Sequence, residues 1–265
     1  MVGALSILRI DGACAFMEVW MLRALLIWLL GAGIAQADCV VLLHGLARSE
    51  TSLLAMEKAL QVQGFQVVNN GYPSTSEPLR VLAPKVGEAV AQCGAQTVHF
   101  VTHSMGGILA RVWLKDHKPE QMGRVVMLAP PNHGSEIVDT LGEVQFLRDA
   151  AEWLNGPATN QLGTDPASVP NLLPPVDFDL GVIAGDIVLN PVGAVVIRGP
   201  SDGTVSVEST RVAGMRDHIV VPTSHSLIMM NPIAMAEVLE YLRNGVFDHG
   251  ITFGAALRKL SRPWN

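Results

Sequence analysis

The sequence has no cluster of basic residues, no internal repeat and no low-complexity tract. Its 18 lysines and arginines are outnumbered by 24 aspartates and glutamates, giving a formal net charge of −6 at pH 7, so nucleic acid is not an expected partner. No set of His, Cys and Asp residues has the spacing of metal ligands, and we predict neither a metal nor another cofactor. Apolar residues, by contrast, are plentiful: 49% of the 265 residues are hydrophobic, enough for one large α/β domain or two small ones.

The first 37 residues have the pattern of an export signal. A short basic segment at 21–23 is followed by an uninterrupted apolar stretch, and the small residues around Gln36 fit a signal peptidase site. We therefore expect cleavage after Ala37 and a periplasmic or secreted protein. An uncleaved N-terminal anchor is the alternative, although the apolar stretch is shorter than the roughly 20 residues that span a bilayer. The residues before this segment fit no signal region, so Met17 and Met21 are alternative starts.

Only three cysteines are present, and the expected cleavage would remove Cys14. An even pair in an exported protein, here Cys39 and Cys93, suggests one disulfide; two buried free thiols are the alternative. Cys39 opens the first expected strand, and Cys93 ends the helix that leads into the strand at 97–101. If these two strands are neighbours, both cysteines lie at the same edge of the sheet.

Short apolar runs alternate with amphipathic segments along residues 38–265, which we expect to form one domain. This rhythm predicts right-handed βαβ units and a mostly parallel sheet with helices on both faces. The expected strands are 39–43, 65–68, 97–101, 124–128, 180–184, 194–197 and 218–221. The expected helices are 51–63, 78–92, 107–117 and 232–242, with Pro84 marking the first turn or a kink of the second.

The alternation of apolar runs and amphipathic segments stops at about 132–178, where Pro, Gly and Asn residues surround one amphipathic patch, Leu141–Leu154. An insertion of this size over the C-terminal edge of a sheet is typical of a cap or lid. The tail from Asp248 contains basic residues and Trp264, so it could contact a membrane surface, although an ordinary solvated helix end has the same composition.

The stretch from Thr97 to Gly107, TVHFVTHSMGG, has the pattern of a buried strand that turns abruptly into a helix. The bend would expose the hydroxyl of Ser104. A serine hydroxyl is a poor nucleophile unless a histidine removes its proton and a carboxylate holds that histidine in the right tautomer. The sequence should therefore supply an acid and a histidine later in the chain, each just past a strand.

Asp202 and His225 fit these two roles. Asp202 lies in an Asp-Gly turn after the expected strand 194–197, and His225 follows the last expected strand. The chain order Ser104, Asp202, His225 is one that such triads adopt. The rival acids are Asp186, Asp139 and Glu136, and the rival histidines are His218, His133, His103 and His44. For the last two, structural hydrogen bonding is the expected role.

The negatively charged oxygen of a tetrahedral intermediate needs two backbone N–H donors. One is expected from Met105, directly after the nucleophile, and the other from Leu46, in the loop after the first strand.

At these motifs the chain resembles the α/β-hydrolase superfamily, and within it bacterial secreted lipases and esterases of the triacylglycerol-lipase kind. The matching segments, in chain order, are His44-Gly45-Leu46, Thr102–Gly107, Pro131–Ser135, Asp202–Val205 and Ser224-His225-Ser226. The resemblance implies a secreted ester hydrolase with Ser104 as nucleophile, Asp202 as acid and His225 as base. The chain departs from the family pattern at Thr102, where the tight elbow has its first glycine.

The expected substrate is a small ester or a lipid, with transient contact to a lipid surface. Two alternatives are carried forward. An acyltransferase or thioesterase could use the same triad, and a non-catalytic protein of this fold could bind a secreted partner. The usual sign of the latter, a missing triad member, is not seen in this sequence.

Overall fold

The computed structural model describes residues 37–143 and 156–262. The expected export signal, Cys14, Trp264 and the part of the amphipathic patch from 144 onward lie outside these residues. Among the described residues, no helix is both long and apolar enough to cross a membrane.

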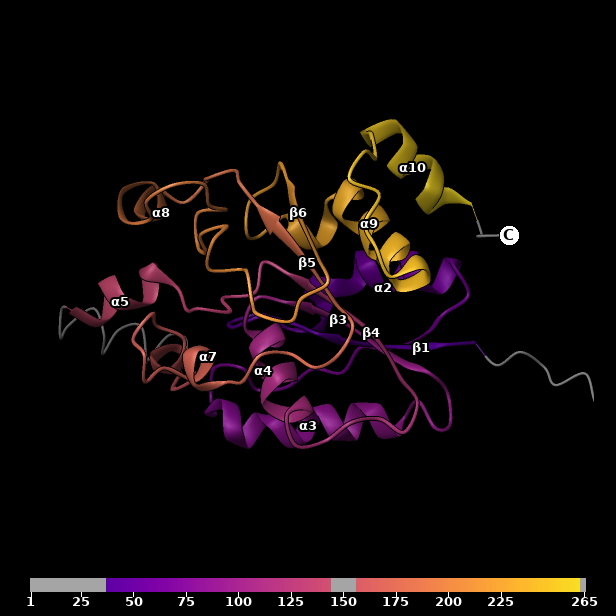
Figure 1. Ribbon diagram of the computed structural model, residues 1–265, viewed down its shortest axis with the longest axis horizontal. Helices are drawn as coiled ribbons and strands as arrows, with labels where there is room; N and C mark the ends of the chain where they lie inside the picture. Colours follow the sequence, from indigo (N-terminus) through magenta and orange to yellow (C-terminus); the bar gives the residue numbers. More distant parts are fainter. Residues whose placement is uncertain (1–36, 144–155, 263–265) are drawn as a thin grey trace, which may run out of the picture. The chain divides into compact units, whose positions relative to one another are not determined.

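Six parallel strands form one sheet in the order β2-β1-β3-β4-β5-β6 (Figure 1). The strands are β1 (Cys39–Leu43), β2 (Gln66–Val68), β3 (Val98–His103), β4 (Met122–Leu128), β5 (Leu180–Gly185) and β6 (Asp217–Val221). Every residue of β1, β3 and β5 is buried, as expected for parallel strands covered on both faces. Six of the seven strands expected from the sequence are therefore confirmed, as is the predicted fold class.

The seventh expected strand, 194–197, is wrong, because these residues lie largely in the short helix α8 (Pro191–Val196). The Asn190 side chain accepts a hydrogen bond from the Val192 amide at 3.0 Å, and Pro191 occupies the first helical position. Both are strong helix-start signals that outweigh the strand preference of the valines. Val195 is 85% exposed, so this segment also lacks the burial of an internal strand.

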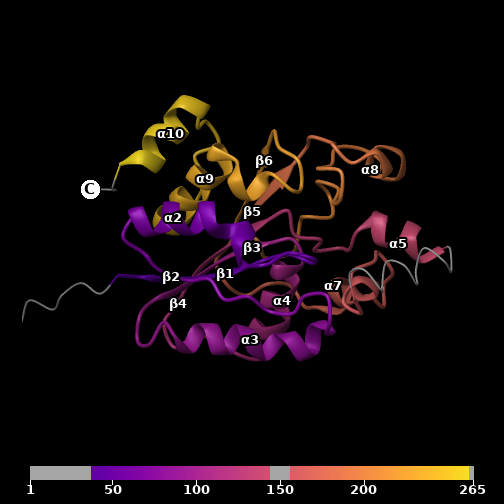
Figure 2. The same ribbon diagram turned by 180° about the vertical axis from the view of Figure 1, so that it is seen from behind.

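Helices cover both faces of the sheet (Figures 1 and 2). One face carries α2 (Leu54–Val62), α9 (Pro232–Asn244) and α10 (Phe253–Ser261), and the other carries α3 (Leu79–Ala91) and α4 (Met105–Leu114). A short 3₁₀ turn at Glu50–Leu53 precedes α2. Alternate side chains of β1 enter the two cores: Val40 and Leu42 pack with α2 and α9, whereas Val41 and Leu43 pack with α3 and α4.

The expected helices are present, with shifted ends. Helix α3 begins at Leu79, so Pro84 lies inside it and does not mark its first turn. Pro84 is exposed, and the Arg80 carbonyl that it leaves without a helical donor can therefore be hydrated. Helix α4 begins at Met105, two residues before the expected start, because the chain bends sharply at Ser104.

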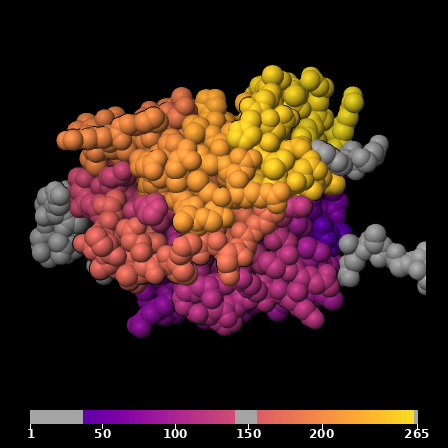
Figure 3. Space-filling model, in the orientation of Figure 1, coloured from indigo at the N-terminus to yellow at the C-terminus, as the bar shows by residue number. Residues whose placement is uncertain are grey.

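The described residues of the segment 132–178 lie at the C-terminal edge of the sheet, with α8 beside them (Figure 1). Its described elements are α5 (Glu136–Glu143), a 3₁₀ turn at Thr159–Gln161 and α7 (Val169–Leu172). In the space-filling view, its coral-coloured residues adjoin the orange loops that follow β5 without a break (Figure 3). Whether this segment moves as a lid stays a prediction.

Arg111, a buried arginine of α4, ties both ends of this segment to the domain. Its guanidinium donates to Asn132 Oδ1 at 3.1 Å and to the carbonyls of Leu173 and Pro174 at 3.4 and 3.2 Å. Burial lowers the pKa of Arg111 to about 10, so the group stays charged at neutral pH. The two ends of the insertion are thus held to one side chain of the helix that follows Ser104.

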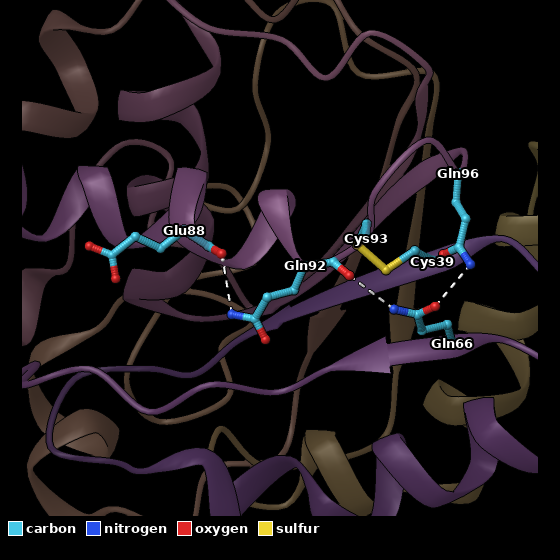
Figure 4. The surroundings of a disulfide bond; sticks show 6 residues. All are labelled: Cys39, Gln66, Glu88, Gln92, Cys93 and Gln96. Carbon is cyan, nitrogen blue, oxygen red and sulfur yellow. Dashed lines mark hydrogen bonds between the residues drawn. A yellow bond between two sulfur atoms is a disulfide. The ribbon is translucent and has the colours of Figure 1, made fainter.

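Cys39 and Cys93 form a disulfide with a Cα–Cα distance of 5.7 Å, which confirms the expected pair (Figure 4). β1 and β3 are indeed neighbours, with Cys39 opposite Val98. Both cysteines are buried, and Gln66 bridges the same edge by donating to the Gln92 carbonyl at 3.1 Å. The bond therefore joins β1 to the end of α3 at the sheet edge opposite the loop that follows Leu43.

Replacing both cysteines, Cys39→Ala with Cys93→Ala, should lower the free energy of unfolding by about 2–4 kcal/mol. The reason is that the bond closes a chain segment with a sequence separation of 54 and so restricts the unfolded chain. Urea denaturation with and without a reductant measures the effect.

Reductant should lower the urea midpoint of the wild type and leave that of the double variant unchanged. Equal midpoints for the oxidised wild type and the double variant would show that the bond contributes nothing.

Candidate active site

Ser104 occupies a strained turn between β3 and α4. Its backbone angles are φ 52° and ψ −125°, a region that residues other than glycine rarely adopt, and its amide donates to the Leu128 carbonyl at 2.9 Å. Such strain persists only where the surrounding structure holds it, and it concentrates at functional sites.

Gly106 makes this turn possible. A Cβ at this position would lie 2.3 Å from the Leu43 carbonyl oxygen and 2.7 Å from that of His44, so only glycine lets α4 approach the end of β1. Thr102 is fully buried, and its Oγ1 would lie 3.2 Å from a Cβ at Gly107. A Cβ at Gly107 would also lie 3.1 Å from Pro130 Cβ, so glycine at 107 leaves space for both Thr102 and Pro130.

The structure brings Ser104, His225 and Asp202 together. His225 Nε2 lies 3.0 Å from Ser104 Oγ, and His225 Nδ1 lies 2.7 Å from Asp202 Oδ2. Because a carboxylate only accepts, Nδ1 carries the proton and Nε2 presents its lone pair to the serine hydroxyl. The His225 side chain is 13% exposed and that of Asp202 1% exposed, so the serine side of this group is reachable and the acid side is sealed.

Asp202 is buried without being left unsatisfied. Its Oδ1 accepts from the amides of Thr204 and Val205 at 2.9 and 2.8 Å, and its carbonyl accepts from the His225 amide at 3.1 Å. Backbone donors of this kind stabilise the charged carboxylate in a buried position.

Helix α8, the misassigned strand, supports this turn. The Asn190 side chain donates to the Gly203 carbonyl at 3.2 Å, and a Cβ at Gly193 would lie 2.1 Å from the same oxygen. The insertion between β5 and Asp202 therefore packs directly against the turn that presents the acid.

The rival acids lie elsewhere. Asp186 is exposed just after β5, and the Asp139 carboxylate accepts from the Thr164 amide and hydroxyl within the segment 132–178. Glu136 begins α5, and its Oε2 is buried without a hydrogen-bond partner among the described residues, so it does not contact His225 there.

Two of the rival histidines are also bound elsewhere. His133 Nδ1 contacts Asn171 Oδ1 at 3.1 Å, and His218 Nε2 contacts Thr210 Oγ1 at 2.9 Å. Burial, followed by the charge of Arg211, lowers the pKa of His218 to about 4, so this ring is neutral at physiological pH.

His103 and His44 make structural hydrogen bonds on either side of the serine. His103 Nε2 donates to the His225 carbonyl at 3.1 Å, and the two rings lie 4.9 Å apart. Burial, then the neighbouring His225 charge, holds the pKa of His103 well below its usual value, so no second positive charge develops beside His225. His44 Nε2 accepts from the Tyr72 amide at 3.3 Å, which leaves the Nδ1 proton to bond the Gly45 carbonyl at 3.0 Å.

The two expected oxyanion donors stay predictions. Met105 is the first residue of α4, where an amide has no acceptor within the helix. Leu46 follows Gly45 and precedes Ala47, whose φ of 52° turns the loop away from the strand direction. Neither amide donates a hydrogen bond to another described residue, so both are available to a ligand.

Sequence reasoning missed two contacts at this site. Tyr72 stacks on His44 with ring centroids 3.9 Å apart and donates its hydroxyl to the His44 carbonyl, which fastens the loop after β1. Arg48 donates to Ser226 Oγ at 2.8 Å, which joins that loop to the one carrying His225. The sequence offered only two signals for these contacts. One is an aromatic residue in the turn after β2, and the other is an arginine just past His44-Gly45-Leu46. Within the described parts of the chain, no group of three or more His, Cys, Asp or Glu side chains could hold a metal ion.

Gly106→Ala should destabilise the fold by about 2 kcal/mol or more, because the new methyl group meets two backbone carbonyls that cannot move away freely. Thermal unfolding of the variant measures this. Gly254→Ala in α10 is the matched control, since a Cβ there meets only the Arg258 guanidinium at 3.6 Å and should be neutral or slightly stabilising. Equal unfolding temperatures for Gly106→Ala and the wild type would contradict the close approach.

No protein-family model matches the sequence, and no curated protein sequence does either. Solved structures match the fold. Lipase BlEst2 of Bacillus licheniformis in its mature form superposes with a TM-score of 0.59 at 21% identity, over 80% of this chain and 93% of that one. Phospholipase PlaB of Legionella pneumophila, in complex with thio-NAD, gives 0.57 at 16% identity, over 85% of this chain and 62% of that one. A bacterial membrane phospholipase A gives 0.51 at 18% identity, over 80% of each chain.

At these identities the likeness concerns the fold alone. The superposed structures agree with the observed architecture, a six-stranded parallel sheet with helices on both faces. The described part of the chain has the α/β-hydrolase fold.

Proposed function

We propose that the protein is a serine hydrolase that cleaves carboxylic esters, of lipids or other acyl compounds, through an acyl-enzyme intermediate on Ser104. The observation that carries this proposal is the chain of contacts from Ser104 Oγ to His225 Nε2 at 3.0 Å and from His225 Nδ1 to Asp202 Oδ2 at 2.7 Å. Three groups at these distances, in this tautomer, match the requirements of an activated serine.

In the proposed reaction, His225 Nε2 takes the proton of Ser104 as the serine oxygen attacks the ester carbonyl. The imidazolium that forms is stabilised by Asp202, whose charge is held by two backbone amides. His225 then gives its proton to the leaving alcohol oxygen, and the acyl group stays on Ser104. A water molecule, deprotonated by the same nitrogen, releases the acid and restores the serine.

The amides of Leu46 and Met105 are the proposed donors to the oxyanion. They flank Ser104 from the loop after β1 and from the start of α4, and helix α4 adds the partial positive charge of its N-terminus. Preorganised donors stabilise the developing charge without rearranging during the reaction, and one donor is typically worth about 10²–10³ in rate.

Structural neighbours named as a lipase and as phospholipases support an ester or lipid substrate. The segment 132–178 is proposed as a cap over the substrate. We also propose export with cleavage after Ala37, which the disulfide supports because such bonds persist in oxidising compartments.

Transfer to an acceptor other than water uses the same triad, so an acyltransferase or thioesterase is the alternative. Product analysis with a competing alcohol separates the two, because release of the free acid alone excludes transfer. A non-catalytic role is disfavoured by the contact between Ser104 and His225.

A fluorophosphonate probe should label the wild type at Ser104, and Ser104→Ala should abolish both labelling and hydrolysis of p-nitrophenyl esters. The reason is that the phosphonyl group bonds only to an activated nucleophile. Mass spectrometry of the labelled peptide locates the adduct. Persistent labelling of a folded Ser104→Ala variant would end the assignment.

Asp202→Asn should lower kcat by about 10³–10⁴-fold, because an amide can hold His225 in the wrong tautomer. Asp186→Asn, at the exposed rival acid, should leave kcat within about twofold of the wild type. Kinetics on one soluble ester compare the two. A reversed order of effects would move the acid role to Asp186.

A further inference from the structure

Arg48 lies at the junction of the two loops that flank Ser104. It comes two residues after Leu46, in the loop after β1, and donates through a terminal guanidinium nitrogen to Ser226 Oγ at 2.8 Å. Ser226 directly follows His225, whose Nε2 contacts Ser104. The sheet order places three strands between β1 and β6, so this bond closes a bridge between loops from distant strands.

Among the described residues, Arg48 forms no ion pair. Arg48 is exposed, and within residues 37–143 and 156–262 no Asp or Glu oxygen lies within 4.0 Å of its guanidinium. The Asp202 carboxylate is already occupied by His225 and two amides. The Arg48 charge does reach the site, since it helps to lower the pKa of His103, after burial and the His225 charge.

The Arg48 guanidinium is oriented by Ser226 and, among the described residues, has further N–H groups without an acceptor. A guanidinium has five N–H donors in a planar fork, and the bond to Ser226 uses one of them. The Arg48 carbonyl accepts from Ser74 Oγ at 3.4 Å, which adds a second tie to the loop. A preoriented arginine with free N–H groups binds phosphate or carboxylate oxygens in a bidentate manner, which a neutral ester cannot provide.

We propose that Arg48 is a substrate-binding residue that selects acyl esters carrying a phosphate group close to the scissile ester, as in a glycerophospholipid. This inference rests on the proposed function, because it places the anionic group beside the ester that Ser104 attacks. The phosphodiester of a glycerophospholipid lies only a few bonds from its acyl esters, so one ligand spans Ser104 and the neighbouring loop. Ser226 acts as a positioning residue that orients the guanidinium.

The test compares two hexanoyl esters of glycerol, dihexanoylphosphatidylglycerol and trihexanoylglycerol, each kept below the concentration at which it aggregates or separates from water. Arg48→Ala should lower kcat/KM for the phospholipid about 10- to 100-fold more than for the triester, because charge-assisted hydrogen bonds to the phosphate are lost. For Arg48→Lys, kcat/KM for the phospholipid should lie between the values of the wild type and Arg48→Ala, because lysine keeps the charge but lacks the planar fork of N–H donors. Arg258→Ala on α10, an equal change of charge, is the control and should leave the ratio of the two kcat/KM values unchanged.

An equal loss on both substrates would overturn the proposal, because it would show that Arg48 only supports the His225 loop. A loss on neither substrate would overturn it as well. Both substrates are monomeric, so attraction of Arg48 to a charged membrane surface cannot produce the difference.

A binding measurement keeps the test independent of turnover. In the Ser104→Ala background, dihexanoylphosphatidylglycerol should bind at least tenfold more weakly after Arg48→Ala, as measured by calorimetry. If the wild type hydrolyses the esters and Arg48→Ala leaves binding unchanged, only the role of Arg48 is refuted and the proposed function stands. If the wild type hydrolyses neither ester but Arg48→Ala weakens binding as expected, the proposed function is refuted and the phosphate site stands.

Discussion

The contact of α4 with the end of β1 is the constraint on which the rest of the site depends. Ser104 keeps its unfavourable backbone angles only because Gly106 has no side chain. The helix can therefore approach the carbonyls of Leu43 and His44 more closely than a Cβ would allow. The same approach places the first amide of α4 beside the loop that carries Leu46. A single close packing of backbone on backbone thus sets the direction of the hydroxyl and the position of both proposed oxyanion donors.

Charge around Ser104 is controlled by burial. Two amides and an imidazole N–H donate to the buried Asp202 carboxylate, whereas burial and the neighbouring His225 charge hold the pKa of His103 well below its usual value. In the proposed reaction, His103 therefore adds no positive charge beside His225. Arg48 lies on the exposed side of the same group, where a positive charge costs little to hydrate and can meet an anionic ligand.

The molecule divides stability and function between the two ends of its strands. At one edge, the disulfide ties β1 to the end of α3 with buried sulfur atoms. At the other, loops from β1, β5 and β6 carry the polar groups, and Arg111 secures the segment 132–178 to α4. Parallel strands require this arrangement, because their carboxyl ends all meet at one edge.

Local pattern was sufficient to predict the sheet and the candidates Ser104 and His225, because buried parallel strands leave apolar runs and each of these residues follows one of them. Asp202 was expected after a strand at 194–197 that is helix α8, so only its Asp-Gly turn was a sound signal. The disulfide partners were also predictable, from cysteine number and the expected neighbourhood of two strands. The tertiary structure alone decided that the helix at 191–196 packs on the turn of Asp202, that Arg111 contacts both ends of the segment 132–178, and that Arg48 meets Ser226 across a separation of 178 residues. These depend on contacts between segments far apart in the chain, whereas the predictable features depend on the spacing of neighbours.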